Sequence, residues 1–204
     1  MMTTTEALDL LEIDRTAQDL LFREARTANT FSDEPVSDEQ LAAVYELTKW
    51  APTSMNNQPL RITVLRSESA RRRLLPLLSE GNRTKTETAP LTVILAADTD
   101  FHERLPEVFP HAPDAKNMFS DTEARARTAK LNALLQVGYF IIGVRAAGLA
   151  AGPMTGFDAE AVDREFYPEG ARKSLVVVNI GKPGENPWFG RLPRLAHEDV
   201  LTTL

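Results

Sequence analysis

Cysteine is absent from this chain of 204 residues, and histidine is scarce, with three residues in all. The lack of cysteine excludes disulfide bonds and thiolate metal sites. The histidines show no i, i+4 spacing typical of a helical metal pair, and no acidic ligand pattern surrounds them. We interpret His102, His111 and His197 as surface or loop residues, and the sequence predicts no metal centre.

Several motifs that would define an enzyme class are also missing. No G-x-G-x-x-G and no G-x-x-x-x-G-K-[ST] segment occurs, so a Rossmann dinucleotide domain and a phosphate-cradling loop are unsupported. A serine hydrolase would need a nucleophile elbow such as G-x-S-x-G, which is absent. Ser54 lies in a polar loop without a glycine for that strained turn. A hydrolase is therefore disfavoured.

Excess basic charge and long uninterrupted apolar runs are lacking too. The net charge of −6 argues against a nucleic-acid partner, because phosphate binding needs a basic surface. The run Arg71-Arg72-Arg73 predicts the solvated face of a short helix. The first residues lack the basic start and apolar block of a signal peptide. The most apolar segment, residues 133–152, is interrupted by Gln136 and Arg145, so it indicates a buried helix rather than a membrane span. We expect a cytoplasmic protein without nucleic-acid or membrane partners.

The composition is that of one ordinary globular domain. Apolar residues make up 43% and charged residues 25% of the chain, and we find no internal repeat or low-complexity linker. A chain of this length buries its own core without staples. The sequence therefore predicts a single domain over residues 1–204.

Hydrophobic patterning predicts three strands and four helices. Nearly continuous apolar runs, typical of strands covered on both faces, occur at 60–66, 91–97 and 174–180. Helical periods or caps predict helices over 6–25, from Ser37 to Trp50, from Ser120 to Gly148, and from Asp158 to Tyr167.

Capping boxes pair Ser37 with Gln40 and Ser120 with Glu123. The second half of the long helix is apolar nearly all round, so it must be central or covered by a partner subunit.

Two segments read as irregular. Residues 98–119 contain three prolines and no clear period, and long loops of this kind are often lids. The tail from 181 to 204 is extended and proline-rich, and such tails commonly wrap a neighbouring subunit.

A polar loop stands at the junction of the second helix and the first strand. Residues 50–59 read WAPTSMNNQP, which places five hydrogen-bonding side chains between two prolines. A plain turn needs only one or two such residues. The surplus predicts a surface that binds a polar, planar partner.

Five short segments in order carry a family resemblance: RTANTF at 26–31, PTSMNNQP at 52–59, NRTK at 82–85, PMTGF at 153–157 and RLPRL at 191–195. In this order they resemble the FMN-dependent nitroreductase family, over roughly residues 23–195. ARTANTF, KWAPTS, FPHAP and GPMTGFD are most similar to the malonic semialdehyde reductases of pyrimidine catabolism.

The resemblance implies an α+β fold with a central, mostly antiparallel sheet surrounded by helices. It also implies an interlocked homodimer with FMN at its interface. NADH or NADPH would give hydride to flavin N5 and leave, and a small acceptor would then take the hydride. Alternatives are a broad nitro, quinone or enone reductase, a flavin-binding protein without turnover, and a dimeric scaffold that binds no flavin.

The resemblance also implies the cofactor-binding residues. In the family the polar loop contacts the flavin of the other subunit. The side chains and backbone expected at FMN are those of Arg26, Thr27, Asn29, Pro52, Thr53, Ser54, Met55, Asn56, Asn82, Lys85, Asn132, Pro153, Met154, Thr155, Gly156 and Arg191.

The resemblance also implies individual roles, each of which suits the chemistry of the cofactor. Arg26 and Arg191 are expected at the phosphate, where guanidinium groups form charge-assisted bonds. Lys85 is expected beside N1 and O2, where a cation favours the anionic reduced flavin. The backbone of Thr155 would face N5, and Gly156 would allow a close approach.

The sequence departs from the family pattern in the first motif and in the tail. Asn29 stands where Lys or Arg is common, and Phe189 stands where some relatives carry lysine. We therefore expect weaker retention of FMN during purification. For the acceptor, we expect a lid that excludes water with aromatic side chains and holds a carboxylate with a cation. The candidate substrate residues are Phe101, Arg104, Phe109, Lys116 and Arg194.

Overall fold

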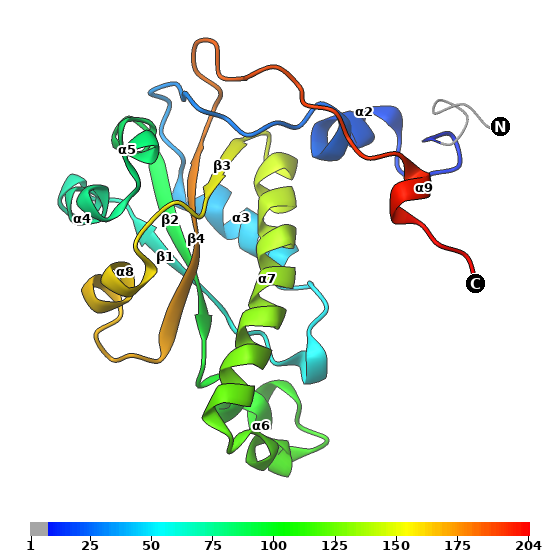
Figure 1. Cartoon of the computed structure of the whole chain (residues 1–204), viewed down its shortest axis with the longest axis vertical. Helices are drawn as coiled ribbons and strands as arrows, with labels where there is room; N and C mark the ends of the chain where they lie inside the picture. Colours follow the sequence, from blue (N-terminus) through cyan, green and yellow to red (C-terminus); the bar gives the residue numbers. More distant parts are fainter. Residues whose placement is uncertain (1–7) are drawn as a thin grey trace.

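A four-stranded antiparallel sheet forms the centre of the protein (Figure 1), in a computed structural model that describes residues 8–204. The strand order is β1-β2-β4-β3. The strands are β1 Leu60–Leu65, β2 Leu91–Asp98, β3 Ala150–Met154 and β4 Arg172–Gly181. All three neighbouring pairs run antiparallel, as the resemblance implies.

The apolar runs correctly predict β1, β2 and β4, but β3 lies outside every predicted strand. Its sequence AAGPM carries Gly152 and Pro153, which are typical of turns. Both residues suit an edge strand. A Cβ atom at Gly152 would lie 2.8 Å from the carbonyl oxygen of Ala28, so only glycine allows the first motif to approach β3.

Helices cover both faces of the sheet (Figure 1). On one face lie α3 Asp38–Thr48 and the long α7 Thr122–Ala146; on the other lie α4 Glu68–Leu74, α5 Glu80–Glu87 and α8 Ala159–Phe166. Along β2, Val93 and Leu95 pack toward α3 and α7, whereas Ile94 and Ala96 pack toward α4 and α8. This two-sided burial explains the continuous apolar run.

Most predicted helix ends are confirmed. Ser37 and Gln40 form both bonds of a capping box. Gly148 has φ of 68° and its N–H donates to the carbonyl of Arg145 at 2.9 Å, as expected of a C-terminal glycine. Asp158 caps α8.

The capping residue of α7 is Asp121, one residue after the predicted Ser120. The carboxylate of Asp121, not Ser120, accepts from the backbone N–H groups of Glu123 and Ala124. These bonds lower the pKa of Asp121. An ionised carboxylate also suits the positive end of the helix dipole, which favours it over a serine hydroxyl.

The N-terminal and lid predictions are corrected in detail. Within residues 8–25 the structure has a short α2 Arg15–Gln18 and a π-helical turn Asp19–Arg23 instead of one helix; residues 6 and 7 lie outside the described part. The stretch 98–119 is not irregular: it folds into α6 Leu105–Val108 between 3₁₀ segments Phe101–Arg104 and Pro113–Phe119. Further 3₁₀ turns span Ser54–Asn56 and Leu75–Leu77.

The tail leaves the sheet after β4 and runs past α2 to a short α9, His197–Val200 (Figure 1). Both ends of the described chain thus lie on the same side of the molecule, away from the sheet. Across residues 8–204, no helix combines the length and apolar character that a membrane crossing requires.

Candidate functional site

The polar loop, residues 53–58, has a strained backbone. Met55, Asn56 and Gln58 have φ values of 53°, 51° and 40°. Non-glycine residues rarely adopt this left-handed region, and such conformations persist only when the surroundings hold them. The rest of the fold therefore holds the loop in this conformation.

Bonds from α6 and α7 hold this loop. The N–H of Ser54 donates to Oδ1 of Asn132 at 2.7 Å, and the N–H of Leu60, just after the loop, donates to Oε1 of Gln136 at 2.9 Å. Nδ2 of Asn56 donates to the carbonyl of Val108 in α6 at 2.7 Å. The loop is thus attached to α7 at both ends and to α6 at its tip.

Asn132 lies behind the polar loop. Its side chain is buried, and its Nδ2 also donates to the carbonyl of Thr128 at 2.9 Å. The amide therefore supports the polar loop from behind, and its predicted place beside the cofactor stays a prediction. Gln136 did not figure among the expected site residues, although its i, i+4 spacing from Asn132 places both amides on one face of α7.

A second group of predicted residues meets where α5 approaches the turn after β3. The carbonyl of Gly156 accepts from Nδ2 of Asn82 and from the N–H of Ser79, each at 2.9 Å. A Cβ atom at Gly156 would lie 2.8 Å from that Nδ2, so the close approach requires glycine. Within residues 8–204 no acceptor takes the N–H of Thr155, which is exposed. The turn after Pro153 and Met154 therefore presents a backbone donor.

Lys85 lies on α5 in the same region. Its side chain is half-buried, and loss of water around the ammonium group lowers its pKa. No acidic side chain among the described residues forms an ion pair with it. Beneath it, Nδ2 of Asn179 donates to Oγ1 of Thr86 at 3.0 Å, and Oγ1 of Thr92 donates to Oδ1 of Asn179 at 2.9 Å. A buried network thus fixes the helix that carries an available cation.

A third group surrounds a cavity of about 250 Å³ between the first motif and the tail. Two backbone hydrogen bonds hold the first motif. The N–H of Ala28 donates to the carbonyl of Ala151 in β3 at 3.2 Å, and the N–H of Asn29 donates to the carbonyl of Pro187 in the tail at 3.0 Å. The polar side chains that line the cavity are those of Arg26, Thr27, Asn29, Arg191 and Arg194.

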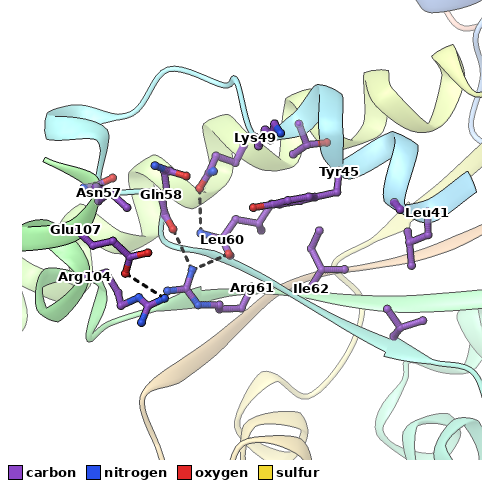
Figure 2. Close-up of a pocket in the computed structure, with 15 residues that line it drawn as sticks. Leu41, Tyr45, Lys49, Asn57, Gln58, Leu60, Arg61, Ile62, Arg104 and Glu107 are labelled. Carbon is purple, nitrogen blue, oxygen red and sulfur yellow. Dashed lines mark hydrogen bonds and ion pairs between the residues drawn. The ribbon is translucent and has the colours of Figure 1, made fainter. Parts of the chain in front are cut away.

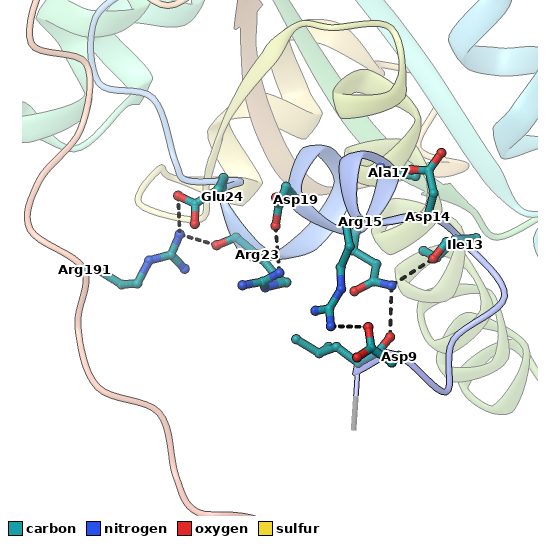
Figure 3. A network of polar contacts seen from close by, with 11 residues as sticks. Asp9, Ile13, Asp14, Arg15, Ala17, Asp19, Arg23, Glu24 and Arg191 are labelled. Atoms are coloured by element: carbon teal, nitrogen blue, oxygen red, sulfur yellow. Dashed lines mark hydrogen bonds and ion pairs between the residues drawn. The ribbon is translucent and has the colours of Figure 1, made fainter. Parts of the chain in front are cut away.

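The guanidinium groups of this arginine cavity have exposed contacts. Arg26 donates to the carbonyl of Phe189 at 3.5 Å. Arg191 contacts the carbonyl of Arg23 and lies 3.8 Å from the carboxylate of Glu24 (Figure 3). Within the part of the chain that the structure describes, Arg194 donates to the neighbouring tail carbonyls of Leu192 and Pro193. Three cations near one cavity, with one distant carboxylate, can bind an anion.

The lid residues divide into core and surface. Phe101 is fully buried and packs edge-on against Phe119, with ring centroids 4.9 Å apart. Its ring therefore packs inside this segment of the chain, and its assignment as a substrate residue stays a prediction. Phe109 is partly buried and its ring contacts that of His111 at 3.9 Å.

The two lid cations already have acidic partners. Arg104 lies 3.3 Å from Glu107, and Lys116 lies 3.4 Å from Glu103. All four side chains are well exposed, so these pairs are weak and can open for a ligand.

A larger groove of about 640 Å³ lies between α3 and β1 (Figure 2). Leu41, Tyr45 and Ile62 give it an apolar floor. Asn57 also lines it; this side chain is 2% exposed, yet neither its amide nitrogen nor its oxygen has a partner within the described chain. Nothing in the sequence distinguishes Asn57 from its polar neighbours. Among residues 8–204, no three His, Asp or Glu side chains gather as a metal site would require.

Known proteins are similar to this chain over nearly its whole length. The model of the Nitroreductase family matches residues 22–182. A Streptomyces coelicolor protein, named as a candidate NADH dehydrogenase/NAD(P)H nitroreductase, is 60% identical over 195 residues, which cover 95% of this chain and 99% of the relative.

Two solved structures share the fold. One is a nitroreductase-like protein from Exiguobacterium sibiricum in complex with FMN, with a TM-score of 0.82, 19% identity and coverage of 95% of this chain and 99% of that one. The other, titled as an NAD(P)H:FMN oxidoreductase from Staphylococcus epidermidis, has a TM-score of 0.81, 19% identity and coverage of 95% and 98%.

Proposed function

Because the chain belongs to the Nitroreductase family, we propose that it is an oxidoreductase that binds FMN, takes hydride from NADH or NADPH and passes it to a small organic acceptor. One observation carries the proposal. Residues far apart in the sequence meet in two places, at the turn beside α5 and at the arginine cavity, with the donors and cations that FMN needs.

The residues present fit this cofactor. Arg26 and Arg191 would hold the phosphate, and Asn82 would address the pyrimidine edge through its amide. When bound, FMN supplies hydride acceptance and donation at its N5 atom. Lys85 would stabilise the negative charge of the reduced flavin. No acidic side chain of residues 8–204 pairs with its ammonium group, which leaves the positive charge available. The backbone N–H of Thr155 would donate a hydrogen bond to the ring.

We propose that two copies of the chain build each site. Asn82 and Lys85 belong to α5 on one face of the sheet, whereas α7 holds the polar loop on the other face. The sheet separates them within one chain, so a flavin that contacts both needs a second copy.

Exposed apolar side chains support this dimer. In the single chain, α3 with the turn that follows it and α7 expose large apolar side chains, and the tail adds several more. A monomer rarely leaves so many uncovered on adjacent elements. These exposed residues are Tyr45, Leu47, Trp50, Leu131, Leu134, Leu135, Tyr139, Phe189, Leu192 and Leu195.

The groove along β1 offers a place for the partner's tail. Among the described strands, β1 has a neighbour on one side alone, so the backbone groups of its outer edge can bind an extended segment. The unpartnered amide of Asn57 carries both a donor and an acceptor, as a peptide group does. The extended, apolar tail is the segment of this chain that suits the groove.

For the acceptor we propose a short aldehyde acid such as malonic semialdehyde, which would become 3-hydroxypropionate. A small acid has little apolar surface, so its carboxylate must contribute binding through a cation. The candidate cations are Arg104, Lys116 and Arg194. The alternative is a broad nitro, quinone or enone reductase, for which an apolar stacking surface suffices.

The test is anaerobic. The FMN-loaded protein is mixed with NADH or with NADPH while the blue absorbance band is followed, and is then reoxidised with semialdehydes, enones, quinones and nitroaromatics. We expect bleaching by at least one nicotinamide and fastest reoxidation by a semialdehyde acid. A band that neither donor bleaches would indicate a flavin-binding protein without turnover. Equal rates with neutral acceptors would favour the broad reductase.

A further inference from the structure

Two side chains of α7 accept hydrogen bonds from the backbone at the two ends of the polar loop. Asn132 and Gln136 lie one helical turn apart on α7, and both are at least 95% buried. Their oxygens accept from the N–H groups of Ser54 and Leu60 at 2.7 and 2.9 Å. The two bonds enclose the three residues with positive φ.

The geometry of this pair is set by α7. Asn132 also donates to Thr128 on its own helix, so the direction of its oxygen is set. The backbone of α7 fixes the distance between the two acceptors, because a helix rises 1.5 Å per residue. The ends of the loop are therefore held at a defined separation by a rigid element.

We propose that Asn132 and Gln136 are positioning residues, which hold the polar loop in its left-handed conformation so that it is competent to line the cofactor. The inference rests on the proposed function and deepens it. Without these acceptors, Met55, Asn56 and Gln58 would relax toward ordinary backbone conformations. Only the fraction of molecules with the competent loop would then bind FMN, and the apparent affinity would fall by that fraction.

A general structural role must be separated from positioning, because removing any buried hydrogen bond lowers stability. Gln136→Met removes the acceptor at nearly constant size, whereas Gln136→Glu keeps an acceptor oxygen for Leu60. The matched control is Ser174→Ala, because Ser174 donates to Asp163 at 2.7 Å in the contact between α8 and β4, away from the loop. Asn132→Leu tests the other end of the loop should Gln136→Met not fold.

Two quantities are measured for each variant at pH 8: the FMN dissociation constant, and hydrogen exchange of the peptide covering residues 53–60 in the protein freed of FMN. For Gln136→Met we expect about a tenfold rise in the dissociation constant, the size of one lost buried hydrogen bond, and faster exchange of the loop. Gln136→Glu should stay near wild type. Ser174→Ala should lower the melting temperature and leave both quantities unchanged.

The proposal is overturned if a folded Gln136→Met or Asn132→Leu protein keeps wild-type FMN affinity and loop exchange. An equal loss of affinity in Ser174→Ala would also overturn it, because the effect would then be one of stability. A wild-type protein that does not bind FMN would instead contradict the proposed function, and hydrogen exchange of the loop would still decide whether the two amides position it.

Discussion

The polar loop and the arginine cavity are two regions of one proposed site, and they differ in the hydrogen bonds that hold their groups in place. The loop is held by bonds of 2.7 to 2.9 Å from α6 and α7, in a conformation that it would not adopt alone. The guanidinium groups of Arg26 and Arg191 have exposed contacts: Arg26 to the carbonyl of Phe189 in the tail, and Arg191 to the carbonyl of Arg23 at the end of the π-helical turn and to Glu24.

This difference matches the two ends of the proposed cofactor. A planar ring gains from a preformed surface, because rigid contacts reduce the loss of freedom on binding. A phosphate is compact and strongly charged, and long flexible cations can close on it after it arrives. We infer that ring recognition is built into the folded chain, whereas phosphate recognition is completed by the ligand.

The largest expected effect concerns the arginine cavity. Arg26→Met should raise the FMN dissociation constant by about tenfold to a hundredfold, the range for one charge-assisted hydrogen bond to phosphate. Riboflavin, which lacks the phosphate, should bind the variant and the wild type equally. Arg164→Met, which removes an exposed cation on α8, is the control and should change neither constant. A parallel loss of riboflavin binding would place Arg26 away from the phosphate.

The second prediction concerns Lys85, which is proposed to lie beside the flavin ring. Lys85→Met should lower the flavin midpoint potential and slow reduction by NAD(P)H by about tenfold, because the reduced anion loses its cation. The fold should survive, since methionine fills much of the same half-buried space. Stopped-flow reduction and redox titration with a reference dye measure the two quantities. An unchanged potential in a variant that holds FMN normally would move Lys85 away from the ring.

The acceptor prediction concerns the exposed cations. Arg104→Met, Lys116→Met and Arg194→Met are assayed separately with malonic semialdehyde and with a neutral quinone. At least one should raise KM for the acid by about tenfold and leave the quinone KM unchanged, because only the acid needs a charged partner. Small, equal effects on both acceptors in all three variants would argue against the semialdehyde acid as substrate.

The smallest effect is expected in the sheet region, far from both parts of the site. Burial raises the pKa of Tyr167, whose hydroxyl donates to Oγ1 of Thr63 at 2.9 Å. Above its ordinary pKa of about 10, tyrosine ionises in the unfolded chain first, so the unfolded state binds fewer protons and stability falls with pH.

Tyr167→Phe should remove the part of the fall in unfolding free energy at alkaline pH that comes from ionisation of this tyrosine. At pH 7 the same change should cost about 1 kcal/mol of unfolding free energy, the size of one hydrogen bond. Urea melts at pH 7 and pH 10.5 measure both. A variant with the same loss between these pH values as wild type would show that Tyr167 does not titrate in this range.

The sequence predicts the sheet better than it predicts the site. Residues 91–97 and 174–180 are apolar on both faces because helices cover both faces of β2 and β4, and this pattern is visible without coordinates. The sequence does not predict β3, because Gly152 and Pro153 are typical of turns. In the fold, Gly152 allows the close approach of Ala28 and Pro153 lies in an edge strand.

The roles of single side chains were harder to predict because they depend on tertiary contacts. Asn132 was expected beside the cofactor, yet its amide is occupied by Ser54 and Thr128. In the sequence, Gln136 is distinguished only as a polar residue in an apolar helix, although its side-chain oxygen accepts from the N–H of Leu60 at the start of β1. Both contacts link residues more than 75 positions apart in the chain, which no local pattern reveals.

The central claim, that two copies of the chain share each site, is tested most directly by mixed dimers. Met55→Pro breaks the polar loop, because proline cannot adopt φ of 53°, and Arg26→Met breaks the arginine cavity. The two variants are coexpressed with different tags, the heterodimer is purified, and its FMN stoichiometry and affinity are measured beside each homodimer. A shared site predicts that the heterodimer regains one FMN with wild-type affinity, because one loop and one cavity remain intact together. A heterodimer that binds no better than either homodimer would contradict the account.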